Sequence, residues 1–594
     1  MTFTTRPELI GTFGMCASTH WIASAVGMKL LEAGGTAFDA AAAMGFVLNV
    51  VEPHLNGPLG DMPAILHVAG EAAPVVLCGQ GTAPARATID HYRSEGLDLI
   101  PGAGLLATVV PGAFDAWMMM LRDHGRLSLR AVLEPAIHYA EAGHPMLPRV
   151  SATIAGQAKF FADEWPTSAA VWTPGGQVPK AGALFRNPDL AAMWRRVLDE
   201  SESVQGRVAQ IDAARRAFAQ GFVAETIDTF MADACPMDGT GERRKGVLSG
   251  QDMAAWQASY EPTVSVDHHG WTVHKCGPWS QGPVLLQCLQ MLRNDPLGDM
   301  DPLGSDMVHL TTEALKRAMA DREAYYGDPD HTDIPVDRLL SMDHADAHRA
   351  GIGQASLDFR PGAIPGHEGQ VTAMLDRLNR AVPEGGLGAG EPTMAHLSNR
   401  RGDTCHIDVA DRWGNMVSAT PSGGWLQSNP VVPGLGVPLN TRAQMFWLED
   451  GLPTSLAPGR RPRTTLSPSF AVHADGTRLA FGTPGGDQQD QWQLAFFLRV
   501  AHAAMNLQEA IDAPLFHTGH LQASFYPRGT QPGHLMIEPH FAARTQQALR
   551  DLGHRIELAE PWTVGRLSAV SRAPDGVMRG AATPRLMQAY AVGR

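Results

Sequence analysis

Apolar residues recur with helical spacing through most of the first two thirds of the chain. Thr19–Ala33 and Ala37–Val51 predict consecutive helices separated by Gly34-Gly35, and the Ala-rich end of the second predicts burial. Met307–Tyr326 predicts a long helix that ends before Gly327. Further helices are predicted at Leu129–His138, Leu190–Leu198, Gln210–Phe230 and Pro283–Arg293. Single strands are predicted at Ala64–Val68 and Val75–Leu77, and two strands within Thr263–Val273.

The pattern changes after Gly402, where apolar and polar residues begin to alternate. Cys405, Ile407 and Val409 fall on one face of a predicted strand, opposite His406, Asp408 and Ala410. Asp411–Asn415 predicts a turn and Met416–Thr420 the return strand. Further strands are predicted at Ser469–His473 and Leu479–Gly482, and helices at Gln493–Met505 and Ala542–Leu552.

Residues 361–399 separate these two regions. They are rich in Gly, Pro and charge, and Val371–Val382 is their only sustained pattern, which is typical of a connector. We therefore expect a helix-rich part over residues 1–403, ending in a Gly/Pro connector near 361–403, and a mixed part over 404–594.

Composition narrows the class of protein. Of 594 residues, 44% are hydrophobic and 18% charged, which suits a globular protein with a large core. The net charge of −14, without a basic block, argues against a nucleic-acid partner. We expect no membrane span and no secretory signal, and hence a cytoplasmic location. The six cysteines form no CxxC pair, so neither a zinc site nor a redox motif is indicated, and we expect no cofactor and no metal.

Thr404 stands where the connector meets the first strand of the C-terminal part. A Thr in this place can attack its own preceding carbonyl, at Asp403, and an N-to-O acyl shift followed by hydrolysis then frees its α-amine. That amine has a pKa of about 7.7–8.0, near the pH at which a general base works best. An ordinary strand threonine is the alternative. Cys405, on the opposite strand face, is expected to pack in the core.

Gly485 and Gly486 follow the predicted strand Leu479–Gly482. Two consecutive glycines let backbone N–H groups turn toward a ligand without a Cβ in the way, and such donors can stabilise an oxyanion. A plain Pro-Gly-Gly turn is the alternative.

Together these motifs resemble the γ-glutamyltranspeptidases and their relatives, which include cephalosporin acylases. The resemblance spans nearly the whole chain. It rests on Met15–Pro53, Val110-Pro111-Gly112, Gly277–Gly282, Ala320–Glu323, Gly327–Pro329, Thr404–His406, Gly414-Asn415, Arg460–Pro462, Ser467-Pro468 and Pro484–Gly486. It implies an α+β fold, a four-layer αββα sandwich, and self-cleavage into a large subunit, 1–403, and a small subunit, 404–594. It also implies cleavage of a small-molecule amide through an acyl-enzyme.

The resemblance also assigns roles to individual residues. Thr404 matches the nucleophile, and Gly485 and Gly486 match the oxyanion pair. Ser422 stands where the family has a second Thr that hydrogen-bonds the nucleophile. Thr464 and Thr465 stand where the glutamyl enzymes have two serines on the substrate carboxylate.

Three positions depart from the glutamyl pattern. Gln80 replaces the family's carboxylate-binding Arg, Met445 replaces the Asp that holds the substrate ammonium, and Gly424 replaces an Asn. Arg442 and Arg463 are candidate replacements for the carboxylate anchor, and an ordinary ion-paired arginine is the alternative for each. We therefore expect an acyl group that carries a carboxylate but lacks the γ-glutamyl amine.

Other conspicuous residues are expected to be structural. His268-His269 has no acidic or histidine partner at metal spacing, and His54 and Asn56-Gly57 are expected to pack beside the site. Asp321-Arg322 is expected to form an internal ion pair.

Three functions remain open from the sequence. They are an amidase or acylase with an altered acyl pocket, a true γ-glutamyl hydrolase or transpeptidase acting on glutathione-type substrates, and an inactive binding scaffold. The sequence also leaves open whether the protein forms a homo-oligomer.

Overall fold

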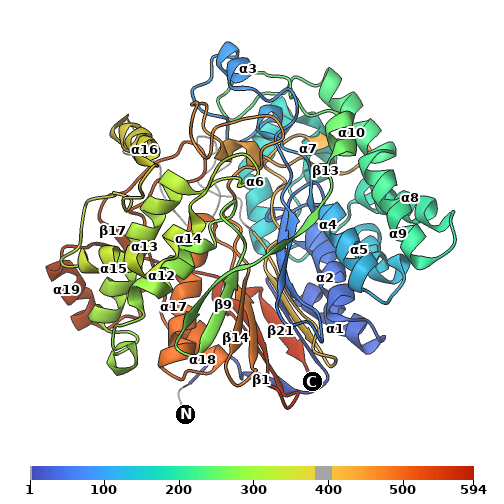
Figure 1. Cartoon of the computed structure of the whole chain (residues 1–594). Coiled ribbons are helices and arrows are strands. Elements are labelled where there is room, and N and C mark those ends of the chain that lie inside the picture. The colour runs from blue at the N-terminus through green and yellow to red at the C-terminus, as the bar shows by residue number, and fades with distance from the viewer. Residues whose placement is uncertain (1–2, 381–403) are drawn as a thin grey trace.

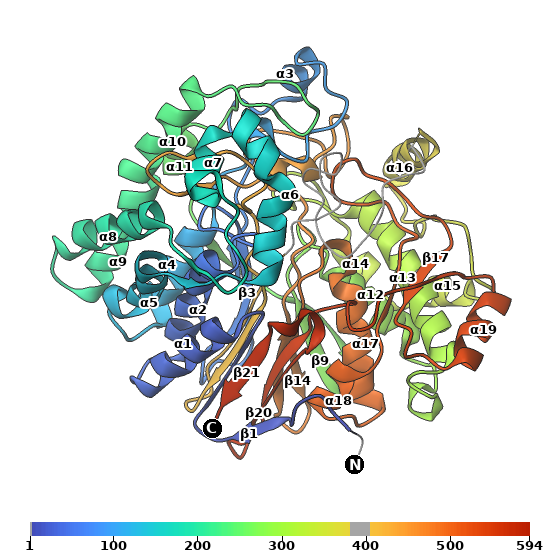
Figure 2. The ribbon, with the colours of Figure 1, turned by 180° about the vertical axis from the view of Figure 1, so that it is seen from behind.

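The computed structural model describes residues 3–380 and 404–594. Within them, two seven-stranded sheets lie face to face, with helices on both outer sides (Figure 1). The same four layers are seen from behind in Figure 2, with both termini at the lower end of the sheets. The α+β class and the αββα sandwich are thereby confirmed.

The first sheet, named here the β10 sheet, carries the hairpin that follows Thr404. All its neighbouring strands are antiparallel. In spatial order its strands are β21 (Tyr590–Gly593), β2 (Gly14–Ser18), β10 (Ile407–Asp411), β11 (Met416–Ala419), β3 (Met62–His67), β4 (Val75–Gly79) and β7 (Ser259–Pro262).

The second sheet, named here the β15 sheet, is also antiparallel throughout. In spatial order its strands are β1 (Leu9–Gly11), β20 (Met578–Ala582), β19 (Ser568–Arg572), β15 (Arg478–Gly482), β14 (Ser469–His473), β9 (Trp271–Lys275) and β8 (Val264–His268). Both sheets therefore combine strands from the two ends of the chain.

The helices form two outer layers. On the β10 sheet side lie α1 (Trp21–Glu32), α2 (Ala37–Val51), α4 (Ala113–His124), α5 (Leu129–Ala142), α8 (Pro188–Glu202), α9 (Arg207–Ala219) and α10 (Phe222–Asp233). On the β15 sheet side lie α12 (Pro283–Leu292), α13 (Ser305–Tyr325), α15 (Met342–Ala350), α17 (Gln489–His502), α18 (Leu507–Asp512) and α19 (Ala543–Asp551).

Further elements lie outside these four layers. The helices are α3 (Ile89–Ser94), α6 (Pro148–Glu164), α7 (Pro166–Trp172), α11 (Gly250–Ala255), α14 (Val336–Leu339) and α16 (Glu368–Arg380), with the 3₁₀ helices η4 (Arg442–Met445) and η5 (Gly486–Gln488) among others. Small sheets pair β5 (His144–Pro145) with β6 (Leu184–Phe185), β12 (Val431–Val432) with β13 (Val437–Pro438), and join β16 (Phe516–Thr518), β17 (His534–Ile537) and β18 (Arg555–Leu558). Among the described residues, no helix is long and apolar enough to cross a membrane.

Helix α2 shows how the sequence produces these layers. Thr36 caps it in a reciprocal capping box with Asp39, which satisfies donors at its first turn. Every residue of the helix is buried, as expected for a helix that is apolar on all sides. It packs in the core between the β10 sheet and the outer helices.

Most of the predicted elements are present within one to four residues at each end. The exception is Gln210–Phe230, which was predicted as one helix and is two, α9 and α10. Gly221 adopts φ −108 and ψ −146, which no helix allows, so the apolar pattern continues across a break. Most of the predicted connector, residues 381–403, lies outside the described residues.

Candidate functional site

Thr404 lies at the entrance of the β10 hairpin, three residues before the strand begins. The Cys405 N–H donates to the Pro421 carbonyl at 3.0 Å, which extends the hairpin pairing beyond the strands. This pairing places the buried Thr404 Oγ1 3.1 Å from Ser422 Oγ. The hydroxyl that the resemblance assigns as the nucleophile and its assigned partner are therefore in hydrogen-bond contact.

Cys405 points away from this pair, as the strand alternation predicts. It belongs to the core between the β10 sheet and its helices, where its thiol donates to Glu52 at 3.2 Å. Burial raises the pKa of the Cys405 thiol well above its usual value, so its thiolate is disfavoured. Cys405 is thus a packed residue and not a competing nucleophile.

His406 follows Thr404 by two residues, and its ring lies between the two sheets against Gly482. Its Nδ1 contacts Thr420 Oγ1 at 3.0 Å and its Nε2 contacts Asp408 at 2.9 Å. Asp408 accepts a further hydrogen bond from Ser568 of β19 at 2.7 Å. This buried chain joins the β10 hairpin to the β15 sheet. The alternation placed His406 and Asp408 on the inner face, but no sequence signal indicated Ser568.

The glycine pair lies at the same end of the sheets. Strand β15 ends at Gly482, whose Cα packs so closely on the His406 ring that a Cβ there would overlap it. Gly485 and Gly486 follow with φ of 135 and 57, values that favour glycine. Within the described part of the chain, neither of their N–H groups donates a hydrogen bond. Unpaired backbone donors are rare in protein interiors, so this turn is suited to bind an oxyanion.

A buried ionic network fixes the turn. Asp487, next to the glycines, accepts from Arg322 at 2.5 Å and from Ser524 at 2.6 Å. Arg322 also binds Glu323, which accepts from Arg463 at 2.5 Å. Burial alone would raise the pKa of Glu323, but Arg463 and Arg322 outweigh it and hold the pKa at about 2.

This network decides two expectations from the sequence, one for Arg463 and one for the Asp321–Arg322 pair. The structure places Arg463 in an internal ion pair with Glu323, which was the alternative to carboxylate binding. The expected Asp321–Arg322 pair is wrong, because neighbouring side chains on α13 point in different directions. Arg322 binds Asp487 and Glu323, whereas Asp321 binds His344 and His348.

Arg442 lies on the other side of Ser422. Ser422 and Asp61 exchange two backbone hydrogen bonds of 2.9 Å each. The Asp61 carboxylate in turn lies 2.9 Å from Arg442 Nε and accepts from Nη2 at 3.0 Å. Burial raises the pKa of Asp61, and Arg442 opposes that shift. Asp61 links Arg442 to the candidate nucleophile, and the sequence did not reveal it.

The three departures from the glutamyl pattern are all buried. Met445 packs in an apolar cluster with Trp425 and Phe525. Gln80 Oε1 has no hydrogen-bond partner among the described residues, although its Nε2 donates to the Gly81 carbonyl at 3.1 Å. Gly424 has φ of 66 and lies against the 57–60 loop. The position of the family's ammonium-binding Asp is therefore apolar here.

Thr464 and Thr465 lie beside the segment that holds the glycine turn. The Thr464 N–H donates to the Trp279 carbonyl at 2.8 Å, and nearby Gln281 donates to the Gly486 carbonyl at 3.2 Å. Thr465 Oγ1 is buried and makes no hydrogen bond within the described residues. An unsatisfied buried hydroxyl costs about 1–3 kcal/mol, which a polar ligand can recover.

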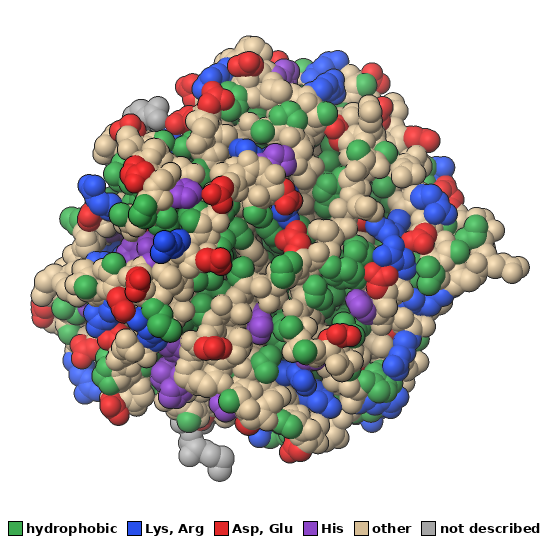
Figure 3. Space-filling model, in the orientation of Figure 1, with side chains coloured by type: hydrophobic (Ala, Val, Ile, Leu, Met, Phe, Trp, Pro, Cys, Tyr) green, Lys and Arg blue, Asp and Glu red, His purple; other side chains and the backbone are tan. Residues whose placement is uncertain are grey.

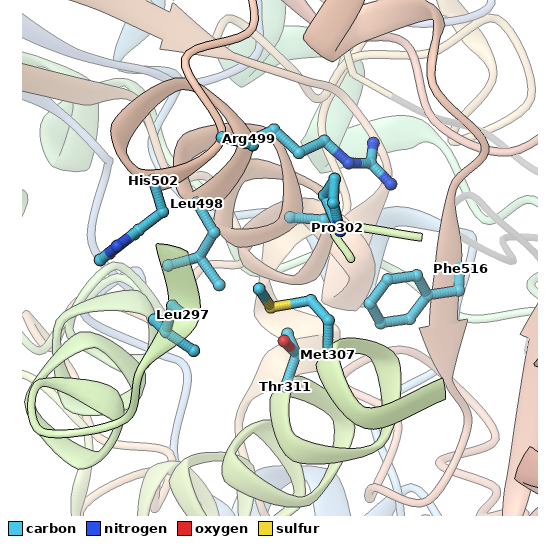
Figure 4. Close-up of a pocket in the computed structure, with 10 residues that line it drawn as sticks. Leu297, Pro302, Met307, Thr311, Leu498, Arg499, His502 and Phe516 are labelled. Carbon is cyan, nitrogen blue, oxygen red and sulfur yellow. The ribbon is translucent and has the colours of Figure 1, made fainter. Parts of the chain in front are cut away.

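His268 contacts a remote histidine that spacing along the sequence does not indicate. Its Nε2 lies 2.8 Å from His502 Nε2, a residue 234 positions away. His502 also lines the cavity shown in Figure 4, between α13 and α17. That cavity has a volume of ≈ 10 Å³, enough for about one water molecule, and is therefore no substrate site.

The surface carries no single strong charge on the face drawn in Figure 3. Acidic and basic side chains are interspersed there. Among the described residues, two side-chain groups could hold a metal ion, and both include residues of α13 but neither Thr404, Ser422 nor the glycine turn. The chemistry available at the site is thus that of hydroxyl, backbone amide and guanidinium groups.

Comparison with known proteins agrees with this geometry. The gamma-glutamyltranspeptidase family model matches residues 23–593. The Glutathione hydrolase-like YwrD proenzyme of Bacillus subtilis (strain 168) is 29% identical over 582 residues, covering 97% of this chain and 98% of the relative. The Oxamate amidohydrolase proenzyme of Klebsiella pneumoniae subsp. pneumoniae is 30% identical over 585 residues, covering 97% and 98%.

Solved structures extend the comparison to the fold. LmbA2991HD is 51% identical, with a TM-score of 0.92 and 100% coverage of both chains. Cephalosporin acylase from Bacillus halodurans is 26% identical, with a TM-score of 0.81 and coverage of 100% and 97%.

The fold and the relatives together define an N-terminal-nucleophile enzyme of the amide hydrolase and acyltransferase class. The chain belongs to the γ-glutamyltranspeptidase family.

Proposed function

We propose that this protein is made as a precursor that cuts itself before Thr404 and then hydrolyses amides whose acyl group carries a carboxylate but no α-ammonium. Thr404 Oγ1 attacks the Asp403 carbonyl and takes the acyl group from its own nitrogen, and water then hydrolyses the ester. This leaves Thr404 with a free α-amine. The relatives reported above are named as proenzymes, which supports such processing.

The same groups then serve the external substrate. The α-amine accepts the Thr404 hydroxyl proton as the oxygen attacks the amide carbonyl, and the protonated amine delivers that proton to the leaving nitrogen. Ser422 orients the hydroxyl, as its 3.1 Å contact supports. The Gly485 and Gly486 N–H groups stabilise the oxyanion. Water, or an acceptor amine, then releases the acyl group from the ester.

The observation that carries the choice of substrate is the environment of Met445. A glutamyl substrate brings an ammonium, and burying that cation without a carboxylate costs several kcal/mol. Met445 packs with Trp425 and Phe525, and none of these three side chains carries a carboxylate. An acyl chain without the amine fits this surface without leaving a charge unpaired.

We assign three groups to the substrate carboxylate. One is the Arg442 guanidinium, which pairs with Asp61 beside Ser422 and has the planar geometry that binds carboxylates. Thr464 and Thr465 supply hydroxyls nearby. The relative named for oxamate, the monoamide of oxalic acid, acts on such a carboxylate-bearing amide, which supports this assignment.

The test compares acyl groups that differ only in the α-amine. We expect processed enzyme to hydrolyse glutaryl p-nitroanilide with a kcat/KM at least tenfold above that for γ-glutamyl p-nitroanilide. Hydrolysis of oxamate and of succinamate, measured by the release of ammonia, would show which acyl length the enzyme prefers. A clear preference for the γ-glutamyl compound would overturn the proposal and favour glutathione-type substrates.

A denaturing gel with intact-mass analysis tests the processing separately. Two fragments that break before Thr404 are expected. A chain that stays whole on prolonged incubation would favour a binding scaffold without activity.

A further inference from the structure

Two clusters of metal-ligating side chains occur in the described part of the chain, and the proposed reaction uses neither. One comprises His309, Glu313 and His554, and the other comprises Asp321, His344 and His348. In each cluster the three ligand atoms lie within 4.8 Å of one another. Their surroundings differ in charge, and that difference decides which one suits a cation.

In the second cluster the ligands converge on one carboxylate oxygen. His344 and His348 lie four residues apart on α15, so both rings face α13. Their Nε2 atoms lie 2.7 and 2.9 Å from Asp321 Oδ2. The Asp321 side chain is fully buried, and the side chains of His344 and His348 are 9% and 8% exposed, so the cluster lies just beneath the surface.

We propose that Asp321, His344 and His348 bind a divalent transition-metal ion, for which Zn²⁺ is the first choice. Two imidazoles and one carboxylate are a frequent ligand set for Zn²⁺, with a water molecule as the fourth ligand. Bonds of about 2.0–2.1 Å in a tetrahedron separate the ligand atoms by roughly 3.3 Å. The present contacts of 2.7 and 2.9 Å therefore need to open by only about half an ångström.

The protons can be rearranged to suit the ion. Each Nε2 must present a lone pair, so each ring must carry its proton on Nδ1. Within the described residues, neither Nδ1 atom makes a hydrogen bond to the protein that would fix the other tautomer. A proton placed on Nδ1 gives up the two Nε2 contacts with Asp321 Oδ2, and bonds from all three atoms to the ion replace them.

Neighbouring groups already hold the carboxylate in place. The Gly362 N–H donates to Asp321 Oδ1 at 2.7 Å, which leaves Oδ2 directed at the histidines. Gln287 Nε2 donates to Oδ2 at 2.7 Å, and Tyr326 in turn donates to Gln287 at 2.6 Å. Such contacts orient metal ligands and are characteristic of built sites.

The first cluster lacks these properties. Glu313 is engaged by Lys316 at 2.6 Å and by Arg317 at 3.3 Å. These two cations already neutralise the carboxylate and would repel an added metal ion. His309 and His554 instead contact each other directly at 2.8 Å. This cluster therefore serves as an internal control of similar composition.

The location indicates what the ion would do. Asp321 belongs to α13, the histidines to α15, and Gly362 to the segment that leads into α16 and on to residues 381–403. A bound ion would fasten α15 to α13 and hold the carboxylate that binds the Gly362 N–H. Its role is structural, because among the described residues neither Thr404, Ser422 nor the glycine turn contacts these ligands.

Metal content and affinity test the proposal in the full-length protein. We expect purified protein to hold about one Zn²⁺ per chain by elemental analysis. After removal of metal with a chelator, we expect it to rebind Zn²⁺ with a Kd below roughly 1 μM in competition with a chromophoric chelator. Co²⁺ should produce a visible absorption band typical of low-symmetry four-coordination.

The variants decide between the clusters. His344→Gln replaces the imidazole with another polar side chain, so folding should survive, and Zn²⁺ affinity should fall at least tenfold. His309→Gln should retain the wild-type affinity.

The thermal midpoint of wild type, but not of His344→Gln, should rise with added Zn²⁺. Absence of Zn²⁺ binding to wild type, or unchanged affinity in a folded His344→Gln, would overturn the proposal. Neither result bears on amide cleavage, which the glutaryl assay tests independently.

Discussion

At the scale of single residues, the contacts of Thr404 support its proposed role as the nucleophile. Its hydroxyl is buried and held 3.1 Å from Ser422, and the glycine turn beyond Gly482 offers unpaired amide donors. Much of the activation is therefore in place before a substrate binds. The nucleophile assignment can be tested directly through the hydroxyl.

Thr404→Ala should abolish both processing and amide hydrolysis, because it removes the attacking oxygen. Thr404→Ser keeps the oxygen and should retain part of each. Ser422→Ala should lower kcat by about tenfold or more while leaving KM nearly unchanged, since it removes an orienting contact and no substrate contact. Intact-mass analysis and the glutaryl assay measure these effects. Wild-type processing in Thr404→Ala would refute the assignment.

Met445 permits a test of substrate selection by one side chain. Met445→Asp restores the carboxylate of the glutamyl enzymes and should raise the ratio of γ-glutamyl to glutaryl kcat/KM at least tenfold, because the ammonium gains a partner. Met445→Leu is the matched apolar control and should leave the ratio unchanged. Burial of the new carboxylate beside Trp425 and Phe525 should also lower stability in urea. An unchanged ratio in a folded Met445→Asp would show that the substrate is selected elsewhere.

At the scale of elements, the sequence predicted those whose pattern is local. The alternation around Ile407 correctly assigned opposite faces to Cys405 and His406, because a strand has a period of two. It missed the break at Gly221, where the apolar spacing continues although the backbone does not. Local pattern reports which side is buried, and it does not report which remote strand covers that side.

The contact between β10 and β15 illustrates a packing constraint with a measurable cost. Gly482→Ala would place a Cβ against the His406 ring, so we expect a loss of about 1–3 kcal/mol in the free energy of unfolding. Gly353→Ala is the matched control, since an added Cβ there meets nothing within 4 Å. Urea unfolding in the uncut Thr404→Ala background measures both. If Gly482→Ala and Gly353→Ala had the same free energy of unfolding, the close packing of Gly482 on the His406 ring would be contradicted.

At the scale of the whole molecule, the order of the motifs resembled a known family, and that resemblance predicted the four layers. It did not predict which residues far apart in the sequence contact each other. Asp408 meets Ser568 across the two sheets, and Asp61 meets Arg442 across most of the chain. Such pairs depend on how the sheets stack, which no spacing within a segment records. The same holds for Asp321, whose histidine partners could be recognised only after α15 was seen to lie against α13.

Buried histidines make the stability of the whole fold sensitive to acid. Burial lowers the pKa of His20 and His517 to about 3, and that of His144 to about 4, from 6.5. The unfolded chain therefore binds protons first as the pH falls below 6.5, so stability is complete above that pH and declines below it. Each such histidine contributes a loss of up to about 1.4 kcal/mol per pH unit. Below about pH 4.5, Glu323 adds a further loss as its unfolded form takes up a proton.

We expect the free energy of unfolding, measured in urea, to fall steadily from pH 6.5 to pH 4.5, with a slope equivalent to the uptake of at least two protons. His517→Phe should reduce that slope by up to one proton, because the aromatic ring keeps the edge-on contact with Trp492 and cannot be protonated. His138→Gln, at an exposed position, is the control and should leave the slope unchanged. A flat profile, or equal slopes in wild type and His517→Phe, would show that His517 accepts its proton without unfolding. The decline above pH 4.5 separates this effect from that of Glu323, since the Glu323 carboxylate begins to matter only at lower pH.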